Sequence, residues 1–202
     1  MKNKYIFSSI LIVCILLCQT SCTEDTTSTT IKLNNFSLEI PLYNSEYVTV
    51  RSNSNDDFYT FSGNTDIFYD DIIFKIPEKF KNYPIRFTVR DVKVKISKTE
   101  NRKSGTSVKD FVSETISENT LVARYVKNEE ISLGDEFSDE GLTRYLEDIF
   151  STIQQKKKVN ISVQGKTDIG FSETEGDPIG LITLMASVSI EMDTLGEEII
   201  IP

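Results

Sequence analysis

The sequence predicts a mainly β protein, an antiparallel β-sandwich or a partly closed barrel with one amphipathic helix packed on it. Three patterns support this prediction. Apolar and polar residues alternate over most of residues 31–202, which we expect to form a single β-rich domain. The alternation slips by one residue inside two long segments. One segment, 138–156, follows the spacing of a helix instead.

The two slips predict bulged or bent strands. The segment "IKLNNFSLEI" (31–40) changes the face of its apolar residues at Asn34-Asn35. The segment "IRFTVRDVKVKIS" (85–97) does the same at Arg90-Asp91. Because strand side chains have a period of two, a slip inside a strand indicates a β-bulge or a strand that bends between two sheets.

Shorter alternating segments predict further strands. They lie at 46–50, 71–76, 120–126, 158–164 and 180–192, with a turn at 193–196 and a last strand at 197–201. The segment 108–116 fits either a short helix or a strand. Pro41, Pro77, Pro84 and Pro178 are expected at strand ends, where a missing N–H donor is tolerated.

The helix predicted over 138–156 has signals at both ends. Ser138 can cap it, acidic residues follow at its positive pole, and lysines 156–158 stand at its negative pole. Its apolar stripe consists of Leu142, Tyr145, Leu146, Ile149, Phe150 and Ile153. We expect this stripe to pack on the sheet, although a docking face for a partner helix would show the same pattern.

The first residues, MKNKYIFSSILIVCILLCQTSC, predict a signal peptide over 1–21. Lys2 and Lys4 precede an apolar run over 5–18, which is shorter than the roughly 20 residues of a membrane span. Small polar residues then lead to Cys22. A plain secretory signal, with Cys22 near its end by accident, is the alternative interpretation.

This segment resembles a bacterial lipoprotein signal. The resemblance implies cleavage before Cys22, a diacylglycerol on its thiol, and stable membrane anchoring by two or three acyl chains such as palmitate. Glu24 and Asp25 resemble the export signal of Bacteroides-type surface lipoproteins, which implies an outer-membrane protein exposed at the cell surface. The Thr-rich residues 22–30 would form an extended, solvated tether.

Two triplets resemble the acceptor motif for O-glycosylation of exported proteins in Bacteroides-type bacteria. They are Asp25-Thr26-Thr27 and Asp193-Thr194-Leu195. The resemblance implies glycans on Thr26, in the tether, and on Thr194, in the turn predicted at 193–196.

Composition argues against several classes of function. Lys2 and Lys4 leave with the predicted signal, so 20 basic residues remain against 31 acidic ones, a net charge of −11. Such a surface repels nucleic acid, and we expect no nucleic-acid partner. The chain has no histidine, and its only cysteine after the predicted signal is Cys22. These absences remove histidine- and thiolate-dependent catalysis, and the sequence indicates no cofactor and no metal site.

The segment "DDFYTFSGNTDIFYDD" (56–71) is the candidate binding segment. Its aromatic rings and acids flank a turn predicted at 62–64. Tyr59, Tyr69 and Asp70 could bind a glycan, since rings stack on sugar C–H faces and carboxylates accept hydroxyl hydrogen bonds. The alternative is a hairpin whose aromatic residues fill the core while its acids stay solvated.

Acidic residues are also candidates for catalysis and for Ca²⁺ binding. Asp57, Asp70, Asp71 and Glu114 are candidates for the carboxylate pair that a glycoside hydrolase needs. The acidic segments 134–141 and 168–177 could bind Ca²⁺, but neither has EF-hand spacing. Helix capping explains the first, and an exposed hairpin loop explains the second.

These observations predict a lipid-anchored cell-envelope protein with a non-enzymatic binding or assembly role. Its partners would be the membrane and a glycan or another envelope protein. One alternative is a carboxylate-dependent, glycan-active enzyme. Another is a structural subunit of an adhesive filament, in which residues 197–201 complete a neighbour's sheet.

Overall fold

The computed structural model describes residues 28–48, 58–74, 76–100, 102, 105–155, 157–169 and 177–194. The strands are β1 (Ser28–Val48), β2 (Phe58–Ile67), β3 (Ile85–Lys98), β4 (Ser107–Ser117), β5 (Thr120–Lys127), β6 (Ile131–Ser132), β7 (Glu136–Phe137), β8 (Val159–Thr167) and β9 (Gly180–Asp193). The helices are α2 (Tyr69–Ile73), the 3-10 turn η1 (Glu78–Phe80) and α3 (Glu140–Gln154).

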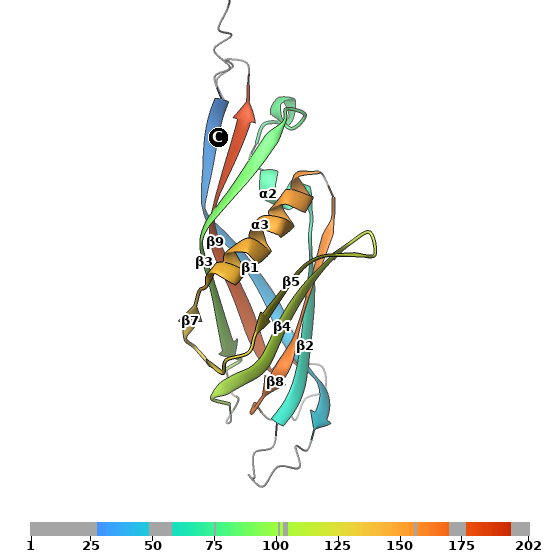
Figure 1. Cartoon of the computed structure of the whole chain (residues 1–202), viewed down its shortest axis with the longest axis vertical. Helices are drawn as coiled ribbons and strands as arrows, with labels where there is room; N and C mark the ends of the chain where they lie inside the picture. The colour runs from blue at the N-terminus through green and yellow to red at the C-terminus, as the bar shows by residue number, and fades with distance from the viewer. Residues whose placement is uncertain are drawn as a thin grey trace, which may run out of the picture.

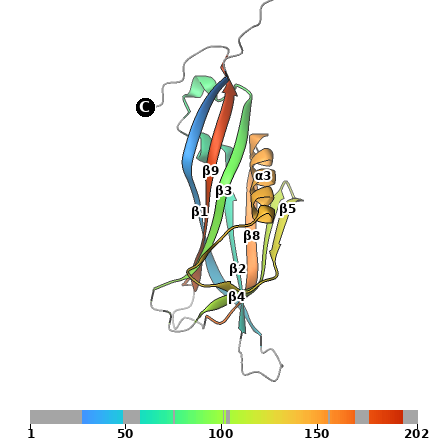
Figure 2. The same cartoon turned by 60° about the vertical axis from the view of Figure 1, so that its left-hand side comes forward.

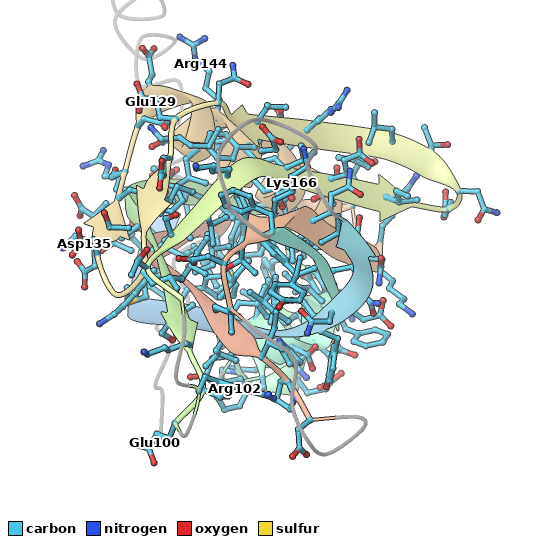
Figure 3. All side chains as sticks on the ribbon, turned by 90° about the horizontal axis from the view of Figure 1, so that it is seen from below. Glu100, Arg102, Glu129, Asp135, Arg144 and Lys166 are labelled. Carbon is cyan, nitrogen blue, oxygen red and sulfur yellow. The ribbon has the colours of Figure 1, made fainter. Side chains whose placement is uncertain are left out.

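The strands form one antiparallel sheet in the order β5-β4-β8-β2-β1-β9-β3-β7, with β6 beside β4. Strand β1 joins the two halves: it pairs with β9 from Ser28 to Leu42 and with β2 from Tyr43 to Val48. Seen along its long axis, the sheet curls around a packed interior (Figure 3). The predicted mainly β fold is confirmed, and the sheet has the form of a half-barrel.

Both predicted bulges are present. The pairing of β1 with β9 shifts between Leu33 and Phe36, and that of β3 with β9 shifts between Arg90 and Lys93. Asp91, in the second bulge, has a φ of 52°, in the left-handed region. The extra residue keeps both Val89 and Val92 buried on either side of the bulge, so a long strand can bend without exposing its apolar face.

The turn predicted at 62–64 is wrong, because β2 runs straight through these residues. Gly63 serves a close approach of two strands: a Cβ there would lie 2.4 Å from the carbonyl oxygen of Pro41. Pro41 was expected at a strand end but lies inside β1, next to the point where β1 changes partner from β9 to β2. The sequence signals of a turn here mark a close approach of β1 and β2 instead.

The strand predicted at 71–76 is also wrong, since this segment begins inside α2. Asp70 and Asp71 lie in the first turn of the helix, at its positive pole. The side chain of Asp71 accepts a hydrogen bond from Phe68 N at 3.1 Å. Tyr69, Ile72 and Ile73 are the buried residues of the helix, at the i, i+3 and i+4 spacing of one helix face.

Helix α3 covers the open side of the half-barrel. It contacts β3 near one end of the strand order and β5 and β8 in the other half, and it lies between them in Figures 1 and 2. Every residue of the predicted apolar stripe is buried, which confirms packing on the protein's own sheet. Burial of each such side chain contributes about 1.5–3 kcal/mol to the free energy of unfolding.

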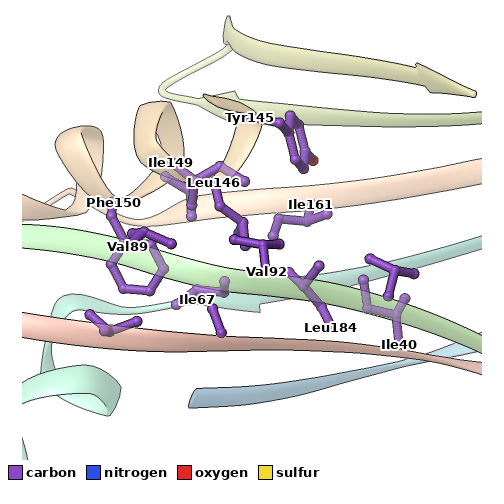
Figure 4. Packing of buried hydrophobic residues seen from close by; sticks show 14 of the residues in the cluster. Ile40, Ile67, Val89, Val92, Tyr145, Leu146, Ile149, Phe150, Ile161 and Leu184 are labelled. Carbon is purple, nitrogen blue, oxygen red and sulfur yellow. The ribbon is translucent and has the colours of Figure 1, made fainter. Parts of the chain in front are cut away.

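Phe150 is at the centre of this packing. Its ring meets those of Phe36 and Phe87 edge-on, at centroid distances of 5.1 and 5.4 Å. Figure 4 shows Phe150, Leu146 and Ile149 of the helix facing the strands of the sheet.

Other boundaries refine the sequence prediction. The N-cap of α3 is Asp139 rather than Ser138, and the helix ends at Gln154. The ambiguous segment 108–116 is a strand, within β4. Strand β1 begins at Ser28, so residues 28–30 belong to the sheet and not to the predicted tether. The last strand, predicted at 197–201, and the signal peptide lie outside the described residues.

Candidate binding groove

A surface groove of about 360 Å³ separates α3 from residues 86–89 of β3. We call it the α3–β3 groove. It is lined by Arg86, Phe87, Thr88, Val89, Glu147, Ser151 and Gln154. This volume lies at the lower end of the range of about 300–1,000 Å³ for ligand pockets.

The helix wall of the groove is polar. Glu147, Ser151 and Gln154 stand at i, i+4 and i+7, so they follow one face of α3 beside its buried stripe. Burial of the stripe against the sheet fixes the rotation of the helix. This rotation turns the three polar side chains toward β3.

The strand wall is a sheet edge that no other described strand covers at residues 85–89. Strand β3 pairs with β9 along its length, but β7 covers its other side only at Val94 and Lys95. The backbone N–H of Phe87 donates to Oε1 of Gln154 at 3.3 Å, so the peptide groups of Phe87 point away from β9. Since peptide groups alternate along a strand, those of Ile85 and Val89 point to the same side.

Each wall carries one charged side chain. Arg86 lies on β3 and Glu147 on α3, and both side chains are exposed. Neither has a salt-bridge partner within the described part of the chain. The groove therefore presents a cation, an anion and a row of backbone donors and acceptors.

The groove holds one carboxylate, whereas glycoside hydrolysis needs two. The candidate acids within the described residues lie elsewhere. Asp70 and Asp71 are on α2, and Glu114 on β4 pairs with Arg124 of β5 at 3.2 Å. Asp57 lies outside the described residues.

The structure does not join Tyr59, Tyr69 and Asp70 into one surface. Tyr59 lies at the start of β2, and Tyr69 follows its end at Ile67, so a strand segment of about 27 Å at the usual rise per residue runs between them. The Tyr69 side chain is 8% exposed, so its ring fills the core and offers no stacking face. Asp70 is exposed beside it. The prediction failed because the expected hairpin is a continuous strand followed by a helix.

Thr194 is the one residue predicted for modification that lies within the described ranges. Cys22 and Thr26 lie outside the described residues. Thr194 is fully buried, and its hydroxyl lies 3.1 Å from that of Thr29. A glycan on Thr194 would require this hydroxyl to leave its place, so the folded conformation disfavours the modification.

The two acidic segments that could bind Ca²⁺ each contain a carboxylate that stabilises the fold. Asp139 accepts hydrogen bonds from Leu142 N at 2.8 Å and from the Tyr125 hydroxyl at 2.6 Å. Burial alone would raise the pKa of Asp139, but these bonds and the nearby charge of Lys127 lower it below its ordinary value.

Asp168 joins β8 to the loop before β4. Its carboxylate accepts hydrogen bonds from Thr106 N at 2.8 Å and from Ser107 N at 3.1 Å. Burial opposes ionisation, yet these donors and the Thr106 hydroxyl lower the pKa of Asp168 below its ordinary value. No cluster of three or more metal-ligating side chains occurs among the residues that the structure describes.

Comparison with models of known protein families and with curated proteins finds no match for this chain. In the described ranges, no helix is both long and apolar enough to cross a membrane.

Proposed function

We propose that this chain is a lipid-anchored cell-envelope protein with a non-enzymatic binding or assembly role, and that the α3–β3 groove is its binding site. The observation that carries this proposal is the groove itself. There an edge of β3 that no other described strand covers faces a polar helix wall, and each wall carries a charged side chain without a salt-bridge partner among the described residues. The resemblance of residues 1–22 to a lipoprotein signal supports the anchor, and Glu24-Asp25 supports export to the outer face of the outer membrane.

The position of the groove suits a protein held near a membrane. The residues between Cys22 and Ser28 span at most about 20 Å. Ser28 pairs with Asp193 of β9, while Arg86 and Phe87 of the groove pair with Glu191 and Ile190 of the same strand. An acyl chain on Cys22 would thus hold the groove in the membrane-proximal half of the domain.

The anchor is tested by the intact mass and membrane fractionation of the protein from its native cells. We expect an acylated chain that starts at Cys22 and stays with the outer membrane, whereas Cys22→Ala is released from it. An unmodified thiol at Cys22, or membrane association that survives Cys22→Ala, would contradict the lipid anchor.

The binding site is tested by photo-crosslinking in intact cells. A photoreactive amino acid at Ser151, on the helix wall, should give a discrete adduct. The matched control is the same amino acid at Asp148, which is exposed on the same helix but does not line the groove. Equal adducts from both positions, or none from Ser151, would remove the groove as the binding site. Turnover of a glycan by the purified chain would instead favour the enzyme alternative.

A further inference from the structure

We propose that the α3–β3 groove binds an extended peptide segment, which adds as a strand to residues 85–89 of β3. This inference rests on the proposed function, because it names the class of partner for the same groove. Strand addition uses the main-chain donors and acceptors of an open sheet edge for affinity and the neighbouring side chains for specificity.

The edge of β3 already accepts a strand from its own chain. Strand β7 pairs with Val94 and Lys95 on the side away from β9. Continued in the same direction, β7 would next cover the bulge and then residues 85–89. The chain turns away instead, because Asp139 caps α3 directly after β7. The helix then runs beside the edge and leaves its peptide groups without a partner strand among the described residues.

Gln154 occupies the position that the carbonyl oxygen of an added strand would take. Its Oε1 accepts the Phe87 N–H at 3.3 Å, a long and therefore weak hydrogen bond. One side chain satisfies one peptide group of the edge. A peptide strand would satisfy Ile85, Phe87 and Val89 together, so exchange of Gln154 for a peptide gains hydrogen bonds overall.

The charges of the groove predict which charged side chains the peptide carries. Arg86 on the strand wall suits an acidic side chain, and Glu147 on the helix wall suits a basic one. Alternate side chains of an added strand point to opposite sides, so one short segment can present both charges. Residues 85–89 span about 17 Å as a strand, which matches a segment of about five residues.

The test uses the full-length lipidated chain in detergent micelles and a phage-displayed library of random nine-residue peptides. We expect binders that carry an acidic and a basic residue. N-methylation at alternate positions of a binder should weaken it at least about tenfold, because each methyl group removes one donor to β3, and methylation between them should change little. Recognition through side chains alone would not show this alternation.

Variants of the chain test whether the peptide binds in the groove. Ser151→Trp should weaken binding at least about tenfold by filling the groove, whereas Asp148→Trp should leave it unchanged. Glu147→Lys should select peptides with an acidic residue in place of the basic one. Gln154→Ala should tighten binding about three- to tenfold, because the peptide no longer displaces a hydrogen bond to Phe87 N.

Several results would overturn the inference. They are the absence of any binder, uniform tolerance of N-methylation, binding that survives Ser151→Trp, and weaker binding by Gln154→Ala. If crosslinking at Ser151 still captures a partner in cells while no peptide binds, strand addition fails and the proposed binding function stands. If Ser151 captures nothing and no peptide binds, both fail.

Discussion

The hydroxyl of Tyr125 donates a hydrogen bond to Oδ2 of Asp139 over 2.6 Å, which ties edge strand β5 to the first turn of α3. The other carboxylate oxygen of Asp139 caps the helix at Leu142 N. One side chain therefore fixes both the start of the helix and its position across the half-barrel. Because α3 forms one wall of the groove, this contact also helps to position the proposed binding site.

Removal of the Asp139 carboxylate should destabilise the fold. Asp139→Ala loses the helix cap and leaves the Tyr125 hydroxyl without its charged acceptor, so we expect a loss of about 2–3 kcal/mol in the free energy of unfolding. Asp139→Asn keeps a capping oxygen and should cost about 1 kcal/mol or less. Urea unfolding followed by circular dichroism measures both. Equal losses for the two variants would contradict the capping role.

The free energy of unfolding should depend on pH at both extremes. Asp139 and Asp168 have pKa values below their ordinary range in the folded state. The unfolded chain therefore takes up protons more readily, and stability is lost as pH falls below about 4. Burial, followed by the bond to Asp139, raises the pKa of Tyr125, and burial raises that of Tyr145. The stability from these tyrosines is present below about pH 10 and is lost above it.

Urea midpoints measured from pH 2 to pH 11 check this profile. The chain has no histidine, so the midpoint should be nearly flat between about pH 5 and pH 9. Asp168→Asn should make the acid limb shallower, and Tyr125→Phe should do the same for the alkaline limb. A midpoint that changes steeply near neutral pH would show that other groups control stability.

The buried hydroxyl of Tyr145 should couple the helix to β4. Ser113 Oγ and Thr115 Oγ1 each lie 2.7 Å from Tyr145 Oη. Tyr145→Phe leaves two buried hydroxyl groups without this partner and should cost about 1–3 kcal/mol. In a chain that already carries Ser113→Ala and Thr115→Val, the same change should cost much less. An undiminished cost in that background would assign the effect to packing rather than to hydrogen bonding.

Gly63 should be intolerant of any side chain. An added Cβ would lie 2.4 Å from the Pro41 carbonyl oxygen, which is backbone and cannot rotate away. We expect Gly63→Ala to cost about 1–3 kcal/mol or more, because β1 and β2 must separate. Ser62→Ala, an exposed neighbour in the same strand, should change the free energy by no more than about 0.5 kcal/mol. Thermal unfolding of the two variants provides the comparison.

The candidate groove could be predicted from the sequence only in part. The i, i+4, i+7 spacing of Glu147, Ser151 and Gln154 is visible in the sequence and assigns them to one polar face of a helix. Nothing local shows that this face meets Arg86 and Phe87, more than 50 residues earlier in the chain. Composition favoured the aromatic segment at 56–71 instead, because its rings and acids are residue types that bind sugars.

The sequence alone predicts the class of fold, the two bulged strands and the stripe of α3, since each depends on a periodicity that its own residues carry. It also carries the resemblance to a lipoprotein signal, which remains a proposal. Three further features emerge only in the folded chain: Gly63 of β2 closely approaches Pro41 of β1, α2 replaces a predicted strand, and α3 lies beside an edge of β3 that no other described strand covers. These features depend on pairings between distant segments, where packing outweighs local preference.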